Sequence, residues 1–281
     1  GRKLFFKCEN FQKVGAFKFR GGWNAVSMLS DKEAEKGVCT HSSGNHAQAV
    51  AFSAQKRGIP AYIVMPNNSP DVKLNAVKGY GANVTLCKPT LEARRTTLEG
   101  IAEQTGAAVI HPFNNANVIA GQGTAALELI EEVGELDAII APIGGGGLMS
   151  GTCITTRSLL PDAKLFGAEP KGADDAYRSL KEGKLLPQED PRTICDGLLT
   201  SMGENTWNIL KDHLDAIYTV SDEDVVQSMR LIWERMKIII EPSCATPVAV
   251  VMSSEFKQLE NIEEVGIILT GGNVDLEKLP F

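Results

Sequence analysis

Short apolar runs rich in β-branched residues alternate with helix-like stretches, and this alternation restricts the fold more than any other feature of the sequence. Residues 38–40, 61–65, 84–86, 138–143 and 165–168 predict strands, and the stretches between them predict helices. Strands that alternate with helices form a mainly parallel sheet with helices on both faces. We therefore expect an α/β fold, in which ligands bind at the carboxyl ends of strands.

The charge balance argues against two classes of partner. The 281 residues carry 28 Lys and Arg against 35 Asp and Glu, a net charge of -7. A mildly acidic chain without long runs of like charge is poorly suited to bind nucleic acid or an anionic membrane. No uninterrupted apolar stretch reaches the length of a membrane span. We therefore expect neither nucleic acid nor membrane among its partners.

The cysteines and the first residues bear on the compartment. Six cysteines without a CxxC pair predict free thiols in a reducing, cytoplasmic environment. From its first residues we expect no signal peptide. It enters directly at a strand-like run without an initiator Met, which leads us to expect further residues upstream.

Four consecutive glycines, residues 144–147, follow an apolar strand and open a predicted helix. Such a loop lets backbone N–H groups surround an anion, and the helix N-terminus favours negative charge. A flexible turn is the alternative, although four glycines at this junction would be unfavourable without a ligand. No Gly-Lys-Ser/Thr follows, so the loop is not a nucleoside-triphosphate P-loop. The sequence therefore predicts an anion site here.

A second glycine-containing segment, residues 121–126, matches the loose G-x-G-x-x-A pattern of dinucleotide-binding loops. The residues before it do not read as a strand, as that motif requires. We therefore interpret its glycines as sites of close helix packing, and a nicotinamide-dependent dehydrogenase is disfavoured.

Two further loops with small polar side chains also follow predicted strands. Ser42-Ser43-Gly44-Asn45-His46 precedes a helix, where such side chains serve either as caps or as ligands. Thr270-Gly271-Gly272-Asn273 suits close approach to a flat ligand, or a tight turn. From these residues alone, a structural role and a ligand-binding role stay open for each loop.

Lys18 is flanked by Phe17 and Phe19. An amine among apolar aromatic side chains is desolvated, which lowers its pKa and makes it a better imine-forming nucleophile. A surface lysine that extends its amine into water is the alternative.

In this order, these segments resemble the fold-type II pyridoxal-phosphate enzymes, and most closely the group of serine racemases and serine/threonine dehydratases. Matching stretches include FFKCENFQKVGAFKFRGG, SSGNHAQAVAFSA, GGGGLMSG and TGGNVD, and they run from the first residues almost to the last. The resemblance implies a tryptophan synthase β-like fold and a homodimer. It also implies a large cofactor-binding domain of residues 1–36 and 115–281, with a small inserted domain of residues 37–114.

The resemblance further implies a role for each candidate residue. Lys18 carries pyridoxal 5'-phosphate, Phe17 packs near its ring, Asn45 contacts the ring hydroxyl, and Thr270 hydrogen-bonds the pyridine nitrogen. The phosphate is held by Gly144, Gly145, Gly146, Gly147 and Leu148. A neutral hydroxyl at the pyridine nitrogen makes the ring a weaker electron sink, which suits elimination and racemisation better than transamination.

The activity implied is interconversion of L- and D-serine, with β-elimination of serine to pyruvate and ammonia. Lys18 is the base on one face of the substrate, and Ser43 is the acid/base group on the other. Typical threonine dehydratases have alanine at the position that matches Ser43, so the resemblance to racemases is favoured by this serine. The substrate is bound by Ser42, Ser43, His46 and Arg94.

Two alternatives stay open. The first alternative is a serine/threonine or hydroxyaspartate dehydratase without racemase activity. It is suggested by Phe113, because the dehydratases have an aromatic residue at the matching position. A catalytically silent relative is the second, against which the intact Lys18 and glycine loop argue.

Glu169, the Ala173 carbonyl and Asp175 match the divalent-cation site of serine racemases. Oxygen ligands suit Mg²⁺, Ca²⁺ or Mn²⁺. Two exposed acids on a loop are the alternative. A nucleotide effector is a further candidate partner, although much of its site in animal enzymes would precede Gly1.

Overall fold

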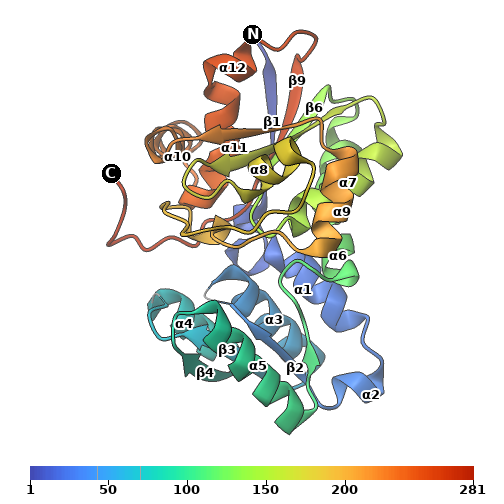
Figure 1. Ribbon diagram of the computed structural model, residues 1–281, viewed down its shortest axis with the longest axis vertical. Coiled ribbons are helices and arrows are strands. Elements are labelled where there is room, and N and C mark those ends of the chain that lie inside the picture. Colours follow the sequence, from blue (N-terminus) through green and yellow to red (C-terminus); the bar gives the residue numbers. More distant parts are fainter. Residues whose placement is uncertain (43, 70) are drawn as a thin grey trace. The chain divides into compact units, whose positions relative to one another are not determined.

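The computed structural model describes residues 1–42, 44–69 and 71–281. The chain divides into two compact units, drawn as ribbons in Figure 1. The first unit comprises Gly1–Phe17 and Gln122–Phe281, and the second comprises Lys18–Gly121. The predicted inserted domain, residues 37–114, lies within the second unit, and its bounds as a domain stay a prediction.

The first unit contains a five-stranded parallel sheet. Its order is β1 (Lys3–Cys8), β9 (Glu264–Leu269), β6 (Ala138–Pro142), β7 (Lys164–Pro170), β8 (Ala216–Val220). The strands β1 and β9 come from opposite ends of the chain and run side by side in Figure 1. The helices of this unit are α6 (Ala116–Val133, which starts in the second unit), α7 (Gly147–Leu159), α8 (Asp175–Glu182), α9 (Glu204–His213), α10 (Asp222–Met236), α11 (Pro242–Met252) and α12 (Ser254–Lys257).

This sheet is buried on both faces. Ala138 and Ile140 pack into a core formed with α10 and α11. The alternate residues Ile139 and Ala141 pack into a second core with α6, α7 and α9. Because successive side chains of a strand point to opposite faces, helices cover both sides of the sheet. The predicted α/β fold with helices on both faces is confirmed.

The second unit repeats this arrangement on a smaller scale. Its parallel sheet has the order β4 (Asn83–Cys87), β3 (Ala61–Pro66), β2 (Val38–His41), β5 (Ala108–Val109). Its helices are α1 (Lys18–Ser27), α2 (Asp31–Ala34), α3 (Asn45–Arg57), α4 (Asp71–Gly79) and α5 (Leu91–Thr105). Val38 and Ile63 face the core with α1 and α3, whereas Cys39 and Val64 face α5.

The glycines at 121 and 123 lie inside α6, where helices pack closely, and not in a phosphate loop. A Cβ at Gly121 would lie 2.6 Å from the carbonyl oxygen of Arg20 in α1. A Cβ at Gly123 would lie 2.8 Å from the carbonyl oxygen of Gly151 in α7. The interpretation of this segment as helix packing is confirmed.

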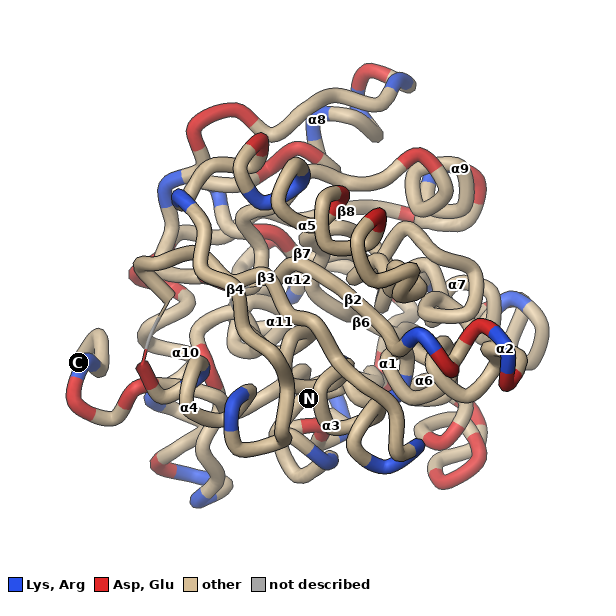
Figure 2. Tube along the Cα trace, turned by 90° about the horizontal axis from the view of Figure 1, so that it is seen from below, with Lys and Arg blue, Asp and Glu red and all other residues tan. Residues whose placement is uncertain are grey.

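The distribution of surface charge and the state of the cysteines agree with what the composition predicts. Figure 2 shows basic and acidic residues interspersed along the trace, as in α2. In the part of the chain that the structure describes, no helix is both long enough and apolar enough to cross a membrane. All six cysteines are free thiols, as predicted.

Candidate active site

In the second unit, Lys18 is the first residue of α1 and is half-buried. Its Nζ donates a hydrogen bond to the carbonyl oxygen of Pro112, at 2.9 Å. Pro112 belongs to the segment that leaves the sheet after β5, at its carboxyl edge. The amine is therefore directed to the end of the sheet where ligands bind in folds of this kind.

Three of the four histidines of the chain have a lowered pKa, and Lys18 contributes to the shift in two of them. Burial, with a smaller contribution from Lys18, lowers the pKa of His46 to about 3. Burial, with contributions from His41 and Lys18, lowers the pKa of His111 to about 4. Burial and then the charge of Arg94 also lower the pKa of His41. All three imidazoles are thus neutral at pH 7.

Hydrogen bonds fix the segment after β5. The carbonyl oxygen of Ile110 accepts from Thr40 Oγ1 at 2.7 Å and from His46 Nε2 at 2.9 Å. The Nδ1 atom of His111 accepts from the backbone amides of Phe113 and Asn114, at 3.3 and 2.9 Å. The segment that faces the Lys18 amine is therefore held from both of its ends.

The other candidate residues of the second unit are placed as follows. Ser42 Oγ accepts from the Gly44 amide at 3.2 Å, and Asn45 is the first residue of α3. His46 is only 2% exposed and uses its donor on Ile110, so its predicted role in substrate binding stays a prediction. Ser43, the proposed second acid/base group, lies outside the described residues.

Arg94 lies on α5 and is half-buried. Its Nε is buried without a hydrogen-bond partner among the residues described, and its charge lowers the pKa of His41. An arginine beside this histidine cluster is available to an anionic group of a ligand. Its substrate role is a prediction that this position supports.

The sequence analysis missed His41 and His111. His41 is the last residue of β2, and His111 follows β5 by two residues. Because both come at the carboxyl ends of parallel strands, their position in the sequence pattern could have marked them as site candidates.

In the first unit, glycines 144–146 lie between β6 and α7, Gly147 is the first residue of α7, and all four glycines are buried. Gly146 has φ +85°, and a Cβ there would lie 2.9 Å from Cβ of Thr206. A Cβ at Gly144 would lie 3.1 Å from the carbonyl oxygen of Gly197. Thr206 Oγ1 also donates to the carbonyl oxygen of Gly145, at 2.8 Å. Neighbouring elements therefore fix the loop in a form that suits glycine.

The amides at the start of α7, including that of Leu148, have no residue of a preceding helical turn to bond. With the helix dipole, they provide a favourable environment for a phosphate group. The N-cap residue, Gly146, offers no side chain that could cap the helix itself. The residues present thus fit the phosphate of pyridoxal 5'-phosphate.

Thr270 follows β9 and is 3% exposed. Its carbonyl oxygen accepts from the backbone amide of Phe17 at 2.9 Å, and Ala16 forms an antiparallel bridge with Gly271. Phe17, the residue before Lys18, is thereby joined to the predicted ligand of the pyridine nitrogen.

The predicted cation site consists of buried acids. Glu169 on β7 and Asp175 at the start of α8 are each 0% exposed, so the alternative of two exposed acids is wrong. The Glu169 carboxylate accepts from the amides of Ala176 and Tyr177, at 3.1 and 2.7 Å. Asp175 Oδ2 accepts from the Met202 amide at 2.9 Å.

Burial and the nearby Asp175 raise the pKa of Glu169 well above its ordinary value. Burial also raises the pKa of Asp175 to about 6, and its Oδ1 has no hydrogen-bond partner in the described part of the chain. Two desolvated carboxylates and an unsatisfied oxygen fit a divalent cation. Within the described ranges, no three His, Cys, Asp or Glu side chains form a metal-binding group, so backbone carbonyls and water would complete the coordination.

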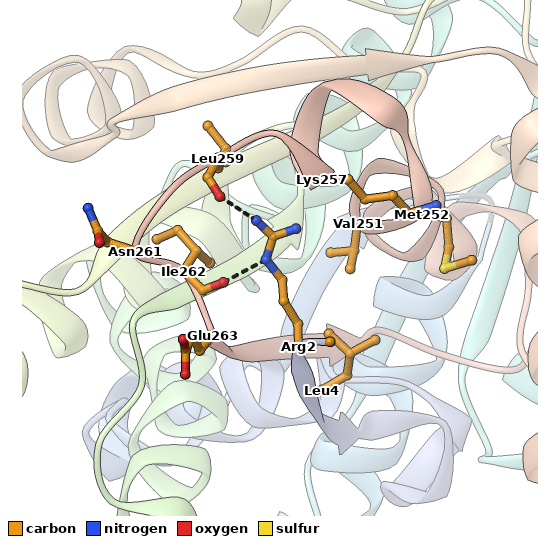
Figure 3. A pocket seen from close by; sticks show the side chains of 10 residues that line it. Arg2, Leu4, Val251, Met252, Lys257, Leu259, Asn261, Ile262 and Glu263 are labelled. Atoms are coloured by element: carbon orange, nitrogen blue, oxygen red, sulfur yellow. Dashed lines mark hydrogen bonds between the residues drawn. The ribbon is translucent and has the colours of Figure 1, made fainter.

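A cavity of about 750 Å³ lies elsewhere in the first unit, beside β1 (Figure 3). The guanidinium of Arg2 projects into it and donates to the carbonyl oxygens of Leu259 and Ile262, at 2.6 Å each. None of the predicted site residues lines this cavity. Its arginine is committed to main-chain carbonyls, so we do not assign it to the chemistry.

Comparison with known proteins agrees with the site. The family model described as pyridoxal-phosphate dependent enzyme matches residues 1–271. Serine racemase of Dictyostelium discoideum is 54% identical over 281 residues, which cover 99% of this chain and 87% of that protein. The β-hydroxyaspartate dehydratase of Paracoccus denitrificans is 49% identical, over 100% of this chain and 89% of that protein.

The solved structure of maize serine racemase superposes with a TM-score of 0.97 at 46% identity, covering 99% of this chain and 85% of that one. The family model covers most of the sequence, and the sequence identities to these relatives are far above those expected from a shared fold alone. The chain therefore belongs to the fold-type II family of pyridoxal-phosphate-dependent enzymes.

Proposed function

We propose that this chain is a serine racemase that interconverts L- and D-serine and also eliminates water from serine, with pyruvate and ammonia as final products. The observation that carries the proposal is the 54% identity to a serine racemase over nearly the whole chain. The position of Lys18 at the carboxyl edge of a parallel sheet, with its amine hydrogen-bonded to Pro112, agrees with it.

The cofactor would be held by the residues predicted from the sequence. The amides of Gly144, Gly145, Gly146, Gly147 and Leu148 bind its phosphate, and Thr270, Phe17 and Asn45 contact its ring. When bound, pyridoxal phosphate supplies the electron sink that makes the Cα proton of an amino acid removable.

The protein supplies the proton transfers. Lys18 removes the Cα proton as a general base from one face. Ser43 delivers a proton to the opposite face, which inverts the configuration. Ser42, His46 and Arg94 bind the substrate, and the cationic Arg94 suits its carboxylate.

A dehydratase without racemase activity is the second candidate. The 49% identity to a β-hydroxyaspartate dehydratase favours it specifically. The aromatic ring of Phe113, which packs edge-on against His111 at 4.6 Å between centroids, lies in the same segment as the Lys18 partner. A bulky residue there would narrow the choice of substrate.

We further propose that Mg²⁺, Ca²⁺ or Mn²⁺ binds Glu169, Asp175 and the carbonyl oxygen of Ala173. The two buried carboxylates support this assignment. Such a cation stabilises the fold and takes no part in proton transfer. The cytoplasmic location is proposed from the free cysteines, whereas the homodimer and the nucleotide effector are proposed from the resemblance alone. Sedimentation with and without ATP tests the homodimer and the effector.

The test is a chiral assay of L-serine with the cofactor-loaded protein and Mg²⁺, in which D-serine and pyruvate are measured together. D-serine above the level without enzyme supports the racemase. Pyruvate alone supports the dehydratase, and threonine and hydroxyaspartate are then compared as substrates. In the racemase, Ser43→Ala should abolish D-serine formation while pyruvate formation persists in part, and equal loss of both would refute the role of Ser43.

A further inference from the structure

We propose that His111 donates a hydrogen bond from Nε2 to the oxygen on the substrate's Cβ and promotes its departure in the elimination. This inference rests on the proposed function, since it assigns a residue to the same reaction. The argument depends on the tautomer of the ring, on its fixed orientation and on its position beside Lys18.

The tautomer of His111 follows from its two hydrogen bonds. Its Nδ1 accepts from the amides of Phe113 and Asn114, so Nδ1 carries no proton. Burial keeps the imidazole neutral at pH 7, because its pKa is lowered to about 4. A neutral imidazole has one proton, which must then be on Nε2. Nε2 is consequently a hydrogen-bond donor.

The orientation of the ring is equally determined. Two amides hold Nδ1, and the ring of Phe113 packs against it at 90°, so the imidazole cannot flip without losing both bonds. Nε2 lies on the edge of the ring away from these amides. His111 makes no other hydrogen bond with the described residues, so this donor is available to a ligand.

The donor lies close to the proposed base. The Lys18 amine is hydrogen-bonded to Pro112, the next residue after His111, and its charge contributes to the lowered pKa of His111. A substrate whose Cα proton is within reach of Lys18 has its Cβ one bond away. The carboxylate is also attached to Cα, but it is assigned to the cationic Arg94. The oxygen on Cβ is therefore the substrate group left for a donor at this position.

The chemistry of elimination needs such a donor. Lys18 takes the Cα proton, the C–O bond at Cβ breaks, and both electrons of that bond go to oxygen. The departing oxygen takes the proton from the Lys18 ammonium and leaves as water. The unsaturated amino acid then adds water and releases ammonia to give pyruvate. A fixed donor stabilises the charge that develops on oxygen as the bond breaks.

The alternative is a purely structural role, in which His111 only accepts the two amide hydrogen bonds that hold the segment after β5. Two substitutions separate the two readings. In His111→Asn, the side-chain oxygen takes the place of Nδ1 and can accept from the two amides, but the distal donor is lost. In His111→Gln, the amide nitrogen reaches the place of Nε2, but the two amides lose their acceptor.

The experiment compares the loaded wild-type enzyme with both variants on L-serine and on β-chloro-L-alanine, whose chloride leaves without a proton. We expect His111→Asn to reduce pyruvate formation from serine about 100-fold, the size of effect seen when one donor to a developing oxyanion is removed. Elimination of chloride should stay within about twofold by the same argument, since chloride needs no donor. His111→Gln should retain more serine elimination than His111→Asn.

Thermal unfolding and cofactor absorbance of each variant establish that it is folded and loaded. Equal loss on both substrates in His111→Asn, or no loss on serine, would overturn the inference. If the wild-type enzyme forms neither D-serine nor pyruvate from serine, the proposed function fails instead. The two failures are thereby distinguished.

Discussion

The backbone amide of Phe17 donates to the carbonyl oxygen of Thr270, at 2.9 Å. The same two segments are joined by a bond from the Gly272 amide to the carbonyl oxygen of Gly15, at 3.0 Å, and by one from Asn273 Nδ2 to Val14. The lysine proposed to carry the cofactor thus directly follows a residue that is bonded to the proposed partner of the pyridine nitrogen. These bonds form a junction between residues 14–17 and 270–273 within the first unit.

This junction predicts a specific sensitivity at Gly15, which has φ +68° and would place a Cβ 2.8 Å from Oδ1 of Asn273. Gly183 is a matched control, because its φ is +69° and no atom lies within 4 Å of its Cβ position. Alanine at either position should reduce the free energy of unfolding by about 1 kcal/mol through backbone strain. Gly15→Ala should lower the free energy of unfolding more than Gly183→Ala does, as measured by denaturant titration. It should also weaken cofactor binding, as measured by cofactor absorbance. Equal effects at the two positions would contradict the importance of the junction.

The glycine loop allows a second matched comparison. Gly146 and Gly134 have φ +85° and +86°, but only Gly146 is crowded, with Cβ of Thr206 at 2.9 Å. Gly134→Ala should cost about 1 kcal/mol in stability and leave cofactor affinity unchanged. Gly146→Ala should weaken cofactor affinity at least about tenfold, because a shift of the loop removes amides from the phosphate. Fluorescence titration of the apo-protein with pyridoxal phosphate measures both, and unchanged affinity in Gly146→Ala would rule out the phosphate site.

The sequence predicted the elements that have a clear period or a clear ending. Strand β6 was predicted over residues 138–143 and ends one residue earlier, at Pro142. Helix α7 begins at the last of the four glycines, as predicted for a helix that this loop opens. By contrast, α11 was missed, because its residues 243–251 are all buried and it therefore has no amphipathic period.

The histidine cluster could not be predicted from local pattern. His41 and His111 are 70 positions apart in the sequence, and only the parallel pairing of β2 with β5 brings their strand ends together. The burial of Glu169 and Asp175 is also a tertiary property. Two acids in a polar segment read equally well as a solvated loop until the packing of α8 is known.

The neutral, buried His46 predicts a contribution to acid sensitivity. Its pKa is about 3 in the folded protein, against the ordinary histidine value of 6.5 in the unfolded chain, so the unfolded chain binds more protons between these values. Stability should therefore fall as pH decreases below 6.5, by about 1.5 kcal/mol between pH 6.5 and pH 5 from this residue alone.

His46→Gln is the matched variant, because its amide nitrogen can still donate to the carbonyl oxygen of Ile110 but does not titrate. Denaturant unfolding at several pH values should show a shallower decline in this variant than in the wild type. The difference between the two proteins isolates His46 from the carboxylates, which titrate in the same range. Parallel curves would show that His46 does not contribute.

The buried acids Glu169 and Asp175 predict that a divalent cation stabilises the protein in a pH-dependent manner. The pKa of Asp175 is raised to about 6, so the folded state binds more protons than the unfolded state above pH 3.8. Asp175 therefore destabilises the fold progressively as pH rises from 3.8 towards 6, and its ionised carboxylate at pH 7.5 attracts a cation. A cation at 100 times its Kd should add about 2.7 kcal/mol at pH 7.5. The gain should be smaller at pH 5, where Asp175 is largely protonated.

Thermal unfolding with Mg²⁺ or Ca²⁺, and again after chelation, measures this effect. Asp175→Asn can keep the bond from the Met202 amide through its side-chain oxygen, while it removes the charge of the Asp175 carboxylate. This variant should be at least as stable as the metal-free wild type at pH 7.5, because a desolvated charge is lost, and it should gain little from the cation. If the variant and the wild type gain equally, the cation binds elsewhere; if neither gains, the acid pair is not a cation site.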